Sequence, residues 1–263
     1  MSMIPPAGVA GLSDADEPIR QSYSGLYLAA PRERVLDVLG ELGFTGWVGP
    51  QEGRWVVAIA ANARGSVASN RRTIDTVTQE SAAALDAVVL AVEVDREERL
   101  RLLAWRGSEE RLRYDSDPPD DVDEAAIVLD EFGEPVMTGF EEPDHEDMAE
   151  TLLELCETTD EVDDPDAIIS PVTESTNETL ADILAEELGE STSESERLKA
   201  ILRRLSLPRW IVASVSLPKR VPGGPDKEEF TYLGRGKQGA SGRFAAAWTN
   251  RVRKKAKDPQ QRR

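Results

Sequence analysis

The stretch from Tyr114 to Glu196 contains 30 aspartates and glutamates and not one lysine or arginine. These carboxylates repel one another over a Debye length of about 8 Å in physiological salt. The stretch can therefore fold only if its acidic side chains stay in water or meet cations from other parts of the chain. This asymmetry concerns binding partners more than chemistry.

The segments on either side carry a different charge. Residues 1 to 113 have 13 basic and 16 acidic side chains, whereas residues 197 to 263 have 18 basic and 4 acidic ones. The formal net charge of the whole chain is −19. Adaptation to high salt would spread acidic residues along the entire sequence, so the nearly neutral first segment argues against that explanation.

Length and composition indicate a folded protein. The 263 residues, of which 40% are hydrophobic, suffice for one large domain or two smaller ones. The single cysteine, Cys156, excludes an internal disulfide and fits a reducing compartment. The sequence has no long uninterrupted apolar run, and Met1 to Gly11 lack the pattern of a secretion signal. We therefore expect a cytoplasmic protein without membrane contact.

Hydrophobic periodicity predicts an α+β domain over residues 21 to 117, with a mixed or antiparallel sheet and helices on one face. One helix follows Pro31, and a second is expected to begin near Asn70, a good N-cap. A five-residue loop, 49 to 53, is expected to join two strands in a hairpin. The expected strands are 25–29, 44–48, 54–59, 87–92, 100–105 and 111–114.

The flanking segments lack this periodicity. Residues 1 to 20 have the composition of a flexible arm. Residues 118 to 143 are rich in proline and acid, which predicts an acidic linker or a surface excursion.

Residues 144 to 263 are expected to form an acidic helical region with C-terminal strands and a basic helix. Asp144 is a predicted N-cap, and Ser175-Thr-Asn-Glu178 and Ser193-Glu-Ser-Glu196 match the capping-box pattern. Strands are expected at 210–216 and 229–233, and the final helix from about residue 240.

Three short motifs stand out in the first domain: Gly53-Arg-Trp-Val-Val57, Leu100 to Trp105, and Tyr114-Asp-Ser-Asp-Pro118. Through them, residues 25 to 117 resemble a group of uncharacterised bacterial proteins. The resemblance covers less than half of the chain. It implies no activity, because none is known to us for that group.

The acidic stretch has three interpretations. The simplest is a hydrated surface that keeps the protein in solution. The second is a pre-formed negative face on the predicted helices, which would dock a basic protein and act through association rate and partner choice. The residues expected on this face are Asp144, Glu150, Glu154, Glu157, Glu178, Asp182, Glu186 and Glu187.

The third interpretation is a divalent-cation site. Hard cations such as Ca²⁺ and Mg²⁺ take six or more oxygen ligands, which closely spaced aspartates can supply. The candidates are Asp115, Asp117, Asp120 and Asp121, but the sixth-position Gly and twelfth-position Glu of an EF-hand loop are absent. The sequence therefore predicts no cofactor, with Ca²⁺ or Mg²⁺ as the alternative.

The C-terminal segment contains a G-x-G-x-x-G pattern at positions 234 to 239. The sequence after Gly239 is too short for the next strand and acidic residue of a dinucleotide site. The choice lies between a plain turn and an anion contact by Arg235, Lys237 and Arg243 at a helix start. The basic residues of 251 to 263 are expected to pair with the acidic stretch of the same or another copy. The acidic remainder argues against nucleic acid as a partner.

Catalytic constellations are weak. His145, the only histidine, and Cys156 are eleven positions apart on one predicted helix, about 16 Å by the helical rise. No G-x-S-x-G nucleophile elbow is present. We therefore expect a non-enzymatic binding protein: a regulator, an adaptor or an immunity-type inhibitor. The alternative is a metal-dependent hydrolase or nuclease that uses clustered carboxylates and holds phosphate with the basic tail.

Overall fold

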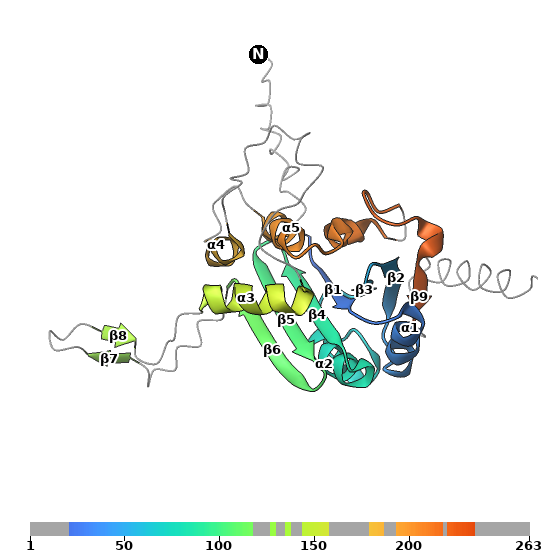
Figure 1. Ribbon diagram of the computed structural model, residues 1–263, viewed down its shortest axis with the longest axis horizontal. Helices are drawn as coiled ribbons and strands as arrows, with labels where there is room; N and C mark the ends of the chain where they lie inside the picture. Colours follow the sequence, from blue (N-terminus) through green and yellow to red (C-terminus); the bar gives the residue numbers. More distant parts are fainter. Residues whose placement is uncertain are drawn as a thin grey trace, which may run out of the picture.

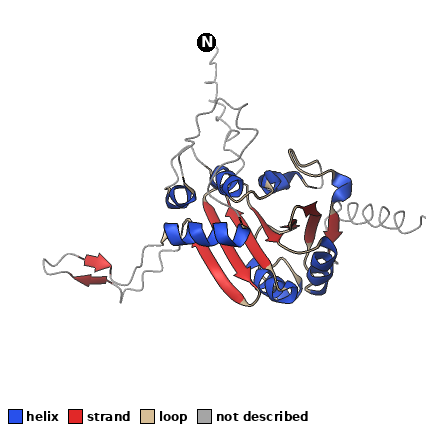
Figure 2. Ribbon diagram, in the orientation of Figure 1, coloured by secondary structure: helices blue, strands red, loops and turns tan. Residues whose placement is uncertain are grey.

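The computed structural model describes residues 21–117, 127–129, 135–137, 144–157, 179–186, 193–217 and 220–234. A seven-stranded antiparallel sheet lies at its centre, with helices on both faces (Figures 1 and 2). The predicted α+β class is confirmed. The strand order is β6–β5–β4–β1–β3–β2–β9. These strands are β1 (Tyr23–Leu28), β2 (Gly46–Glu52), β3 (Trp55–Ala60), β4 (Val88–Asp95), β5 (Arg99–Arg106), β6 (Glu109–Asp115) and β9 (Thr231–Leu233).

Five α-helices and three 3₁₀ helices belong to the described residues. The α-helices are α1 (Arg32–Glu41), α2 (Ile74–Leu85), α3 (His145–Cys156), α4 (Leu180–Ala185) and α5 (Glu194–Arg204). The 3₁₀ helices are η1 (Ser69–Arg71), η3 (Arg209–Ser216) and η4 (Lys227–Glu229). Two further strands, β7 (Ile127–Leu129) and β8 (Pro135–Met137), pair antiparallel with each other.

The strands at the centre of the sheet are apolar on both faces. All six residues of β1 are buried, as is the run Val88 to Val92 of β4. A strand covered on both sides requires such a continuous run instead of an alternating pattern. At Gly25 a Cβ would lie 2.8 Å from both the Ala58 carbonyl oxygen and Ile211 Cδ1, so glycine lets η3 approach the sheet.

One face of the sheet packs against α1 and α2, as predicted for the first domain. The four residues expected to point inward from α2, namely Ile74, Val77, Ser81 and Leu85, are all buried. The other face is covered by α3, α4, α5 and η3, whose apolar residues share one core with the sheet (Figure 1). The acidic helices α3 and α4 therefore bury their apolar sides on the same sheet that α1 and α2 cover from behind.

The expected start of α2 at Asn70 is wrong. Asn70 and Arg71 have φ of 60° and 59° within the η1 turn, a left-handed backbone that cannot begin a right-handed helix. The cap is Thr73, whose hydroxyl accepts a hydrogen bond from the Thr76 N–H. Ser69, Asn70 and Thr73 are all residue types that cap helices, and only the backbone conformation distinguishes them.

The prediction of a five-residue hairpin loop at 49–53 is also wrong. Strand β2 continues through Gly49 and Pro50 to Glu52, with a register shift between Val48 and Gln51, so the turn is only Gly53-Arg54. The Gly49 carbonyl oxygen accepts a hydrogen bond from the Arg32 guanidinium at 2.7 Å. A bulge accommodates a proline that would otherwise interrupt the strand pairing.

Residues 210 to 216 form part of the 3₁₀ helix η3 and not the predicted strand. Trp210, Ile211 and Ser214 are buried, which is a helical spacing, and the Trp210 Nε1 donates to Glu52 Oε1 at 2.7 Å. A short apolar run does not distinguish strand from helix by periodicity. The strand expected at 229–233 is confirmed in part. Residues Thr231–Leu233 form β9, which joins the edge of the main sheet beside β2.

Two of the three predicted helix caps in the acidic stretch are confirmed. Asp144 caps α3 and Ser193 caps α5, in each case by accepting a hydrogen bond from a backbone N–H three residues on. The helix predicted after residue 178 is capped by Thr179, which forms a capping box with Asp182. Residues 175–178, the arm of residues 1–20 and the final basic helix lie outside the described residues.

Candidate functional site

The surface of α3 consists of carboxylates. From the cap at Asp144 to the C-cap at Glu157, every exposed residue is acidic, whereas Ala149, Leu152, Leu155 and Cys156 are buried. The hydrophobic side of the helix therefore faces the core, and the exposed positions of its outer side are all acidic. We call this set the α3 stripe: Asp144, Glu146, Asp147, Glu150, Glu154 and Glu157.

The N-terminal half of the stripe is stabilised by the helix itself. The Asp144 carboxylate accepts a hydrogen bond from the Asp147 N–H at 3.0 Å, and Glu146 and Asp147 lie in the first turn. Negative charge is favoured at this end because the helix dipole is positive there. A row of acids can therefore persist without cations beside it.

The C-terminal half of the stripe meets arginines of the sheet. Glu154 lies 3.4 Å from Arg106 and 3.9 Å from Arg111, and Glu157 lies 2.6 Å from Arg54. Among the described residues, the ion pairs of this helix are confined to Glu154 and Glu157. The open part of the stripe is therefore its first half.

The second group of predicted docking residues lies on α4. Asp182 is exposed, and hydrogen bonds from the Thr179 backbone N–H and hydroxyl lower the pKa of its carboxyl. Glu186 is exposed, and its backbone oxygen accepts from the Arg197 guanidinium. Helices α3 and α4 are neighbours in the same layer (Figure 1). Glu178 and Glu187 lie outside the described residues.

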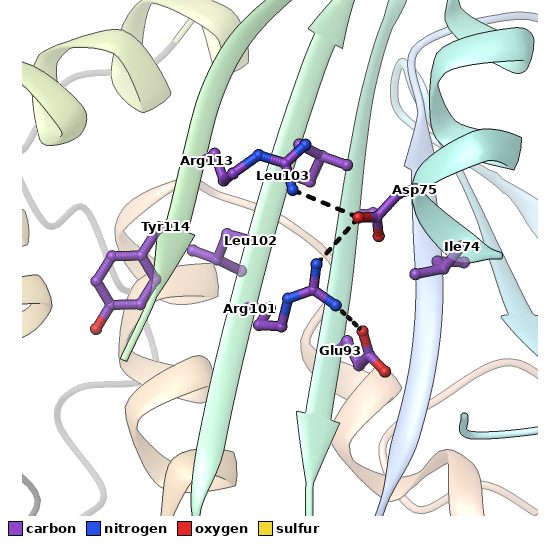
Figure 3. A pocket seen from close by; sticks show the side chains of 9 residues that line it. Ile74, Asp75, Glu93, Arg101, Leu102, Leu103, Arg113 and Tyr114 are labelled. Carbon is purple, nitrogen blue, oxygen red and sulfur yellow. Dashed lines mark hydrogen bonds and ion pairs between the residues drawn. The ribbon is translucent and has the colours of Figure 1, made fainter. Parts of the chain in front are cut away.

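A charged cluster on the opposite face of the sheet was not predicted from the sequence. Arg101 reaches from β5 to Asp75 of α2 at 3.0 Å and to Glu93 of β4 at 2.8 Å, and Arg113 lies 3.4 Å from Asp75 (Figure 3). Burial raises the pKa of Glu93, and the Arg101 charge opposes that rise. The pocket among these side chains has a volume of only about 10 Å³, room for about one water molecule. The cluster ties α2 to the sheet.

One residue of the predicted cation site, Asp115, is paired with an arginine. The Asp115 carboxylate accepts from Arg99 Nε at 2.7 Å and Nη2 at 2.6 Å, a bidentate ion pair. The Asp117 N–H donates to Asp115 Oδ1 at 3.3 Å, whereas Asp120 and Asp121 lie outside the described residues. Within the described part of the chain, no group of three or more His, Cys, Asp or Glu side chains could hold a metal ion.

The residues considered for nucleophilic chemistry occupy separate environments. Cys156 is buried, and burial raises the pKa of its thiol to about 12. His145 lies at the other end of α3, with its ring centroid 6.3 Å from that of Tyr114. A thiol that burial keeps protonated is a poor nucleophile at neutral pH. The proposed anion ligands Arg235, Lys237 and Arg243 lie outside the described residues.

The chain matches no family model, no curated protein and no solved structure. Among the helices that the structure describes, none has the length and apolar content needed to cross a bilayer. The interpretation of the site therefore depends on the geometry of the chain alone.

Proposed function

We propose that this protein is a non-enzymatic, cytoplasmic binding protein whose α3 stripe docks a basic surface of another protein. One observation supports the proposal above the others: the outer side of α3 is uniformly acidic although the core does not require it. A hydrated surface needs only enough polar residues for solubility, and those residues can be of either sign. A regulator, an adaptor or an immunity-type inhibitor would use such a face.

The first half of the stripe is the part expected to meet the partner. Glu146, Glu150 and Glu154 follow at intervals of four residues, which places them on one side of the helix about 6 Å apart along the axis. Glu154 is already paired with sheet arginines, so the field is strongest over Asp144 to Glu150. Lysines or arginines at a similar spacing, as on a basic helix, match this pattern.

Electrostatic docking of this kind acts mainly on the association rate. Complementary charge raises the rate at low salt and loses most of its effect when the Debye length shrinks. The partner is thus selected before close contact, and the neutral residues between the acids refine the fit.

The test compares two triple variants of equal charge. The first neutralises the stripe with Glu146→Gln, Asp147→Asn and Glu150→Gln, which spares the cap and the ion-paired residues. The second neutralises Glu33, Asp37 and Glu41, three exposed acids of α1 on the other face of the sheet. The probe is a synthetic helical peptide with lysine at every fourth position, and the association rate is measured at low and high salt.

We expect the stripe variant to lower the association rate about tenfold at low salt, and the α1 variant to lower it much less. Both differences should vanish at high salt. Equal loss in the two variants would mean that only net charge matters, and the hydrated-surface interpretation would then replace this proposal. A protein captured from cells would count as a partner only if the α1 variant retains it and the stripe variant does not.

A further inference from the structure

A second concave site lies on the same side of the sheet as η3. It opens between the end of η3, the start of β1 and the segment after β3, and has a volume of about 230 Å³. The principal lining residues are Tyr23, Trp47, Ile59, Ala63, Ser214 and Leu217. None of them belongs to α3 or α4, so this pocket is independent of the proposed docking stripe.

The pocket is uncharged in an otherwise highly charged protein. Asp, Glu, Lys and Arg make up 31% of the chain, yet none of the described residues that line the pocket is charged. The lining itself offers an ion no counter-charge, and the pair Asp95–Arg64 beside the lining residue Ser22 is already neutralised. The lining therefore selects a neutral ligand.

Aromatic and aliphatic groups form part of its wall. The Trp47 ring packs edge-on against Tyr232 of β9, with ring centroids 4.7 Å apart, which fixes the indole in place. Tyr23 is buried, and its hydroxyl is already paired with Ser195 Oγ at 2.9 Å. A planar, polarisable ligand suits such a wall because aromatic rings prefer edge-to-face or offset contacts.

Ser214 supplies an unused polar group. Its side chain is 4% exposed, and its Oγ has no hydrogen-bond partner among the described residues. A buried hydroxyl without a partner destabilises a fold, so its retention here calls for an explanation. Serine has three staggered rotamers, and this hydroxyl can turn toward a ligand without breaking any side-chain hydrogen bond in that part of the chain.

We propose that this pocket binds a small neutral molecule consisting of one aromatic ring with a hydrogen-bonding substituent. A dry apolar cavity of about 150 Å³ holds benzene. The larger volume observed here leaves room for an amide or hydroxyl group as well. Trp47 and Tyr23 contact the ring, and Ser214 pairs with the substituent. Charged ligands are disfavoured by the uncharged lining.

The first experiment uses three probes of nearly equal size: benzamide, benzoate and cyclohexanecarboxamide. Binding is measured by calorimetry or by ligand-observed NMR on the full chain. Benzamide should bind with a Kd on the order of 1 mM, and each of the other two should bind at least about tenfold more weakly. Absence of benzamide binding at about ten times that concentration would overturn the proposal, as would equal binding of benzoate.

The second experiment locates the binding. Ala63→Leu fills the pocket from its rim and should weaken benzamide binding by about tenfold or more. Ala83→Leu, at an exposed position of α2 on the other face of the sheet, adds the same volume and should leave the affinity unchanged. Equal affinity in all three proteins would place the ligand elsewhere and contradict the proposal.

Ser214→Ala distinguishes a ligand contact from a structural role. It should weaken benzamide about three- to tenfold, the value of one hydrogen bond. Its melting temperature should not fall, because the hydroxyl stabilises nothing in the described structure. A lower melting temperature with unchanged affinity would assign the hydroxyl to folding and remove it from the site.

Discussion

At the residue scale, the ion pair with Arg99 limits the ligands that the Asp115 carboxylate can bind. Both carboxylate oxygens of Asp115 face cations: Arg99 binds in a bidentate manner, and Arg101 Nε lies 3.7 Å away. A carboxylate held in this way is a structural anion, because a metal ion would have to displace the guanidinium first. Both arginines come from the preceding strand, β5, and the sequence alone does not show that they meet Asp115.

We predict that Asp115→Asn lowers the free energy of unfolding by about 1 kcal/mol, since the ion pair is partly exposed and screened by solvent. Urea denaturation measures this loss, and Asp117→Asn is the control, because its side chain is exposed and forms no ion pair with another described residue. Ca²⁺, Mg²⁺ and Mn²⁺ should leave the midpoints of all three proteins unchanged. A cation at about 100 times its Kd would add about 2.7 kcal/mol. Such a gain in the original protein, lost in Asp115→Asn, would favour the metal-dependent alternative.

At the scale of elements, α5 is held to the sheet by a buried polar network. Glu194, the first residue of α5, is 0% exposed and accepts from the Ser116 hydroxyl. Its carboxylate lies 3.5 Å from Arg197, which also donates to the Tyr114 hydroxyl at 3.1 Å. Burial raises the pKa of Glu194, and Ser116 and Arg197 oppose that rise. The two opposite charges compensate each other's burial and fix the position of α5.

Removing one partner of this pair should cost more than removing both. Arg197→Met leaves Glu194 buried without its cation and should lower the free energy of unfolding by about 3–5 kcal/mol. Adding Glu194→Gln to it should recover part of that loss, because no uncompensated charge then remains. A double-mutant cycle in urea measures both effects. If Arg197→Met were within about 1 kcal/mol of the original protein, the pair would not hold α5.

At the scale of the whole molecule, basic residues from one part of the chain neutralise acidic residues from another. Arginines of the hairpin turn and of β5 and β6 reach the far half of the α3 stripe, so the nearly neutral N-terminal segment offsets part of the acidic stretch. The 18 basic residues after position 196 are another source of cations, and seven of them lie between positions 251 and 263. A second copy of the chain would therefore also be a basic partner for the stripe.

Deleting residues 251–263 tests whether that partner is a second copy. Sedimentation of the full chain should give a larger mass at low salt than at high salt, because screening weakens pairing between exposed charges. The shortened chain should have the monomer mass at both salt concentrations. Equal masses for the full chain under the two conditions would exclude self-association through these charges.

The sequence predicted those features that depend on neighbouring residues. Periodicity identified α1, α3, α5 and the strands β4, β5 and β6, and the caps Asp144 and Ser193 mark helix starts correctly. It also placed Asp144, Glu150, Glu154 and Glu157 on the outer side of α3 but did not include Glu146 and Asp147, although the apolar residues of an amphipathic helix determine which side faces outward. These elements, caps and the outward side of α3 depend on hydrogen bonds and side-chain spacing between residues close together in the sequence.

The tertiary structure alone decided the rest. Whether the segment 210–216 forms a strand or a 3₁₀ helix depended on the sheet face and on Glu52, which is remote from Trp210 in the sequence. The partners of Glu154 and Glu157 depend on which strands lie beneath α3, and the pocket at Trp47 on how η3 crosses β1 and β3. The sequence alone gives the charge and the hydrophobicity of each residue. The distances between residues remote in the sequence are set only when the layers pack.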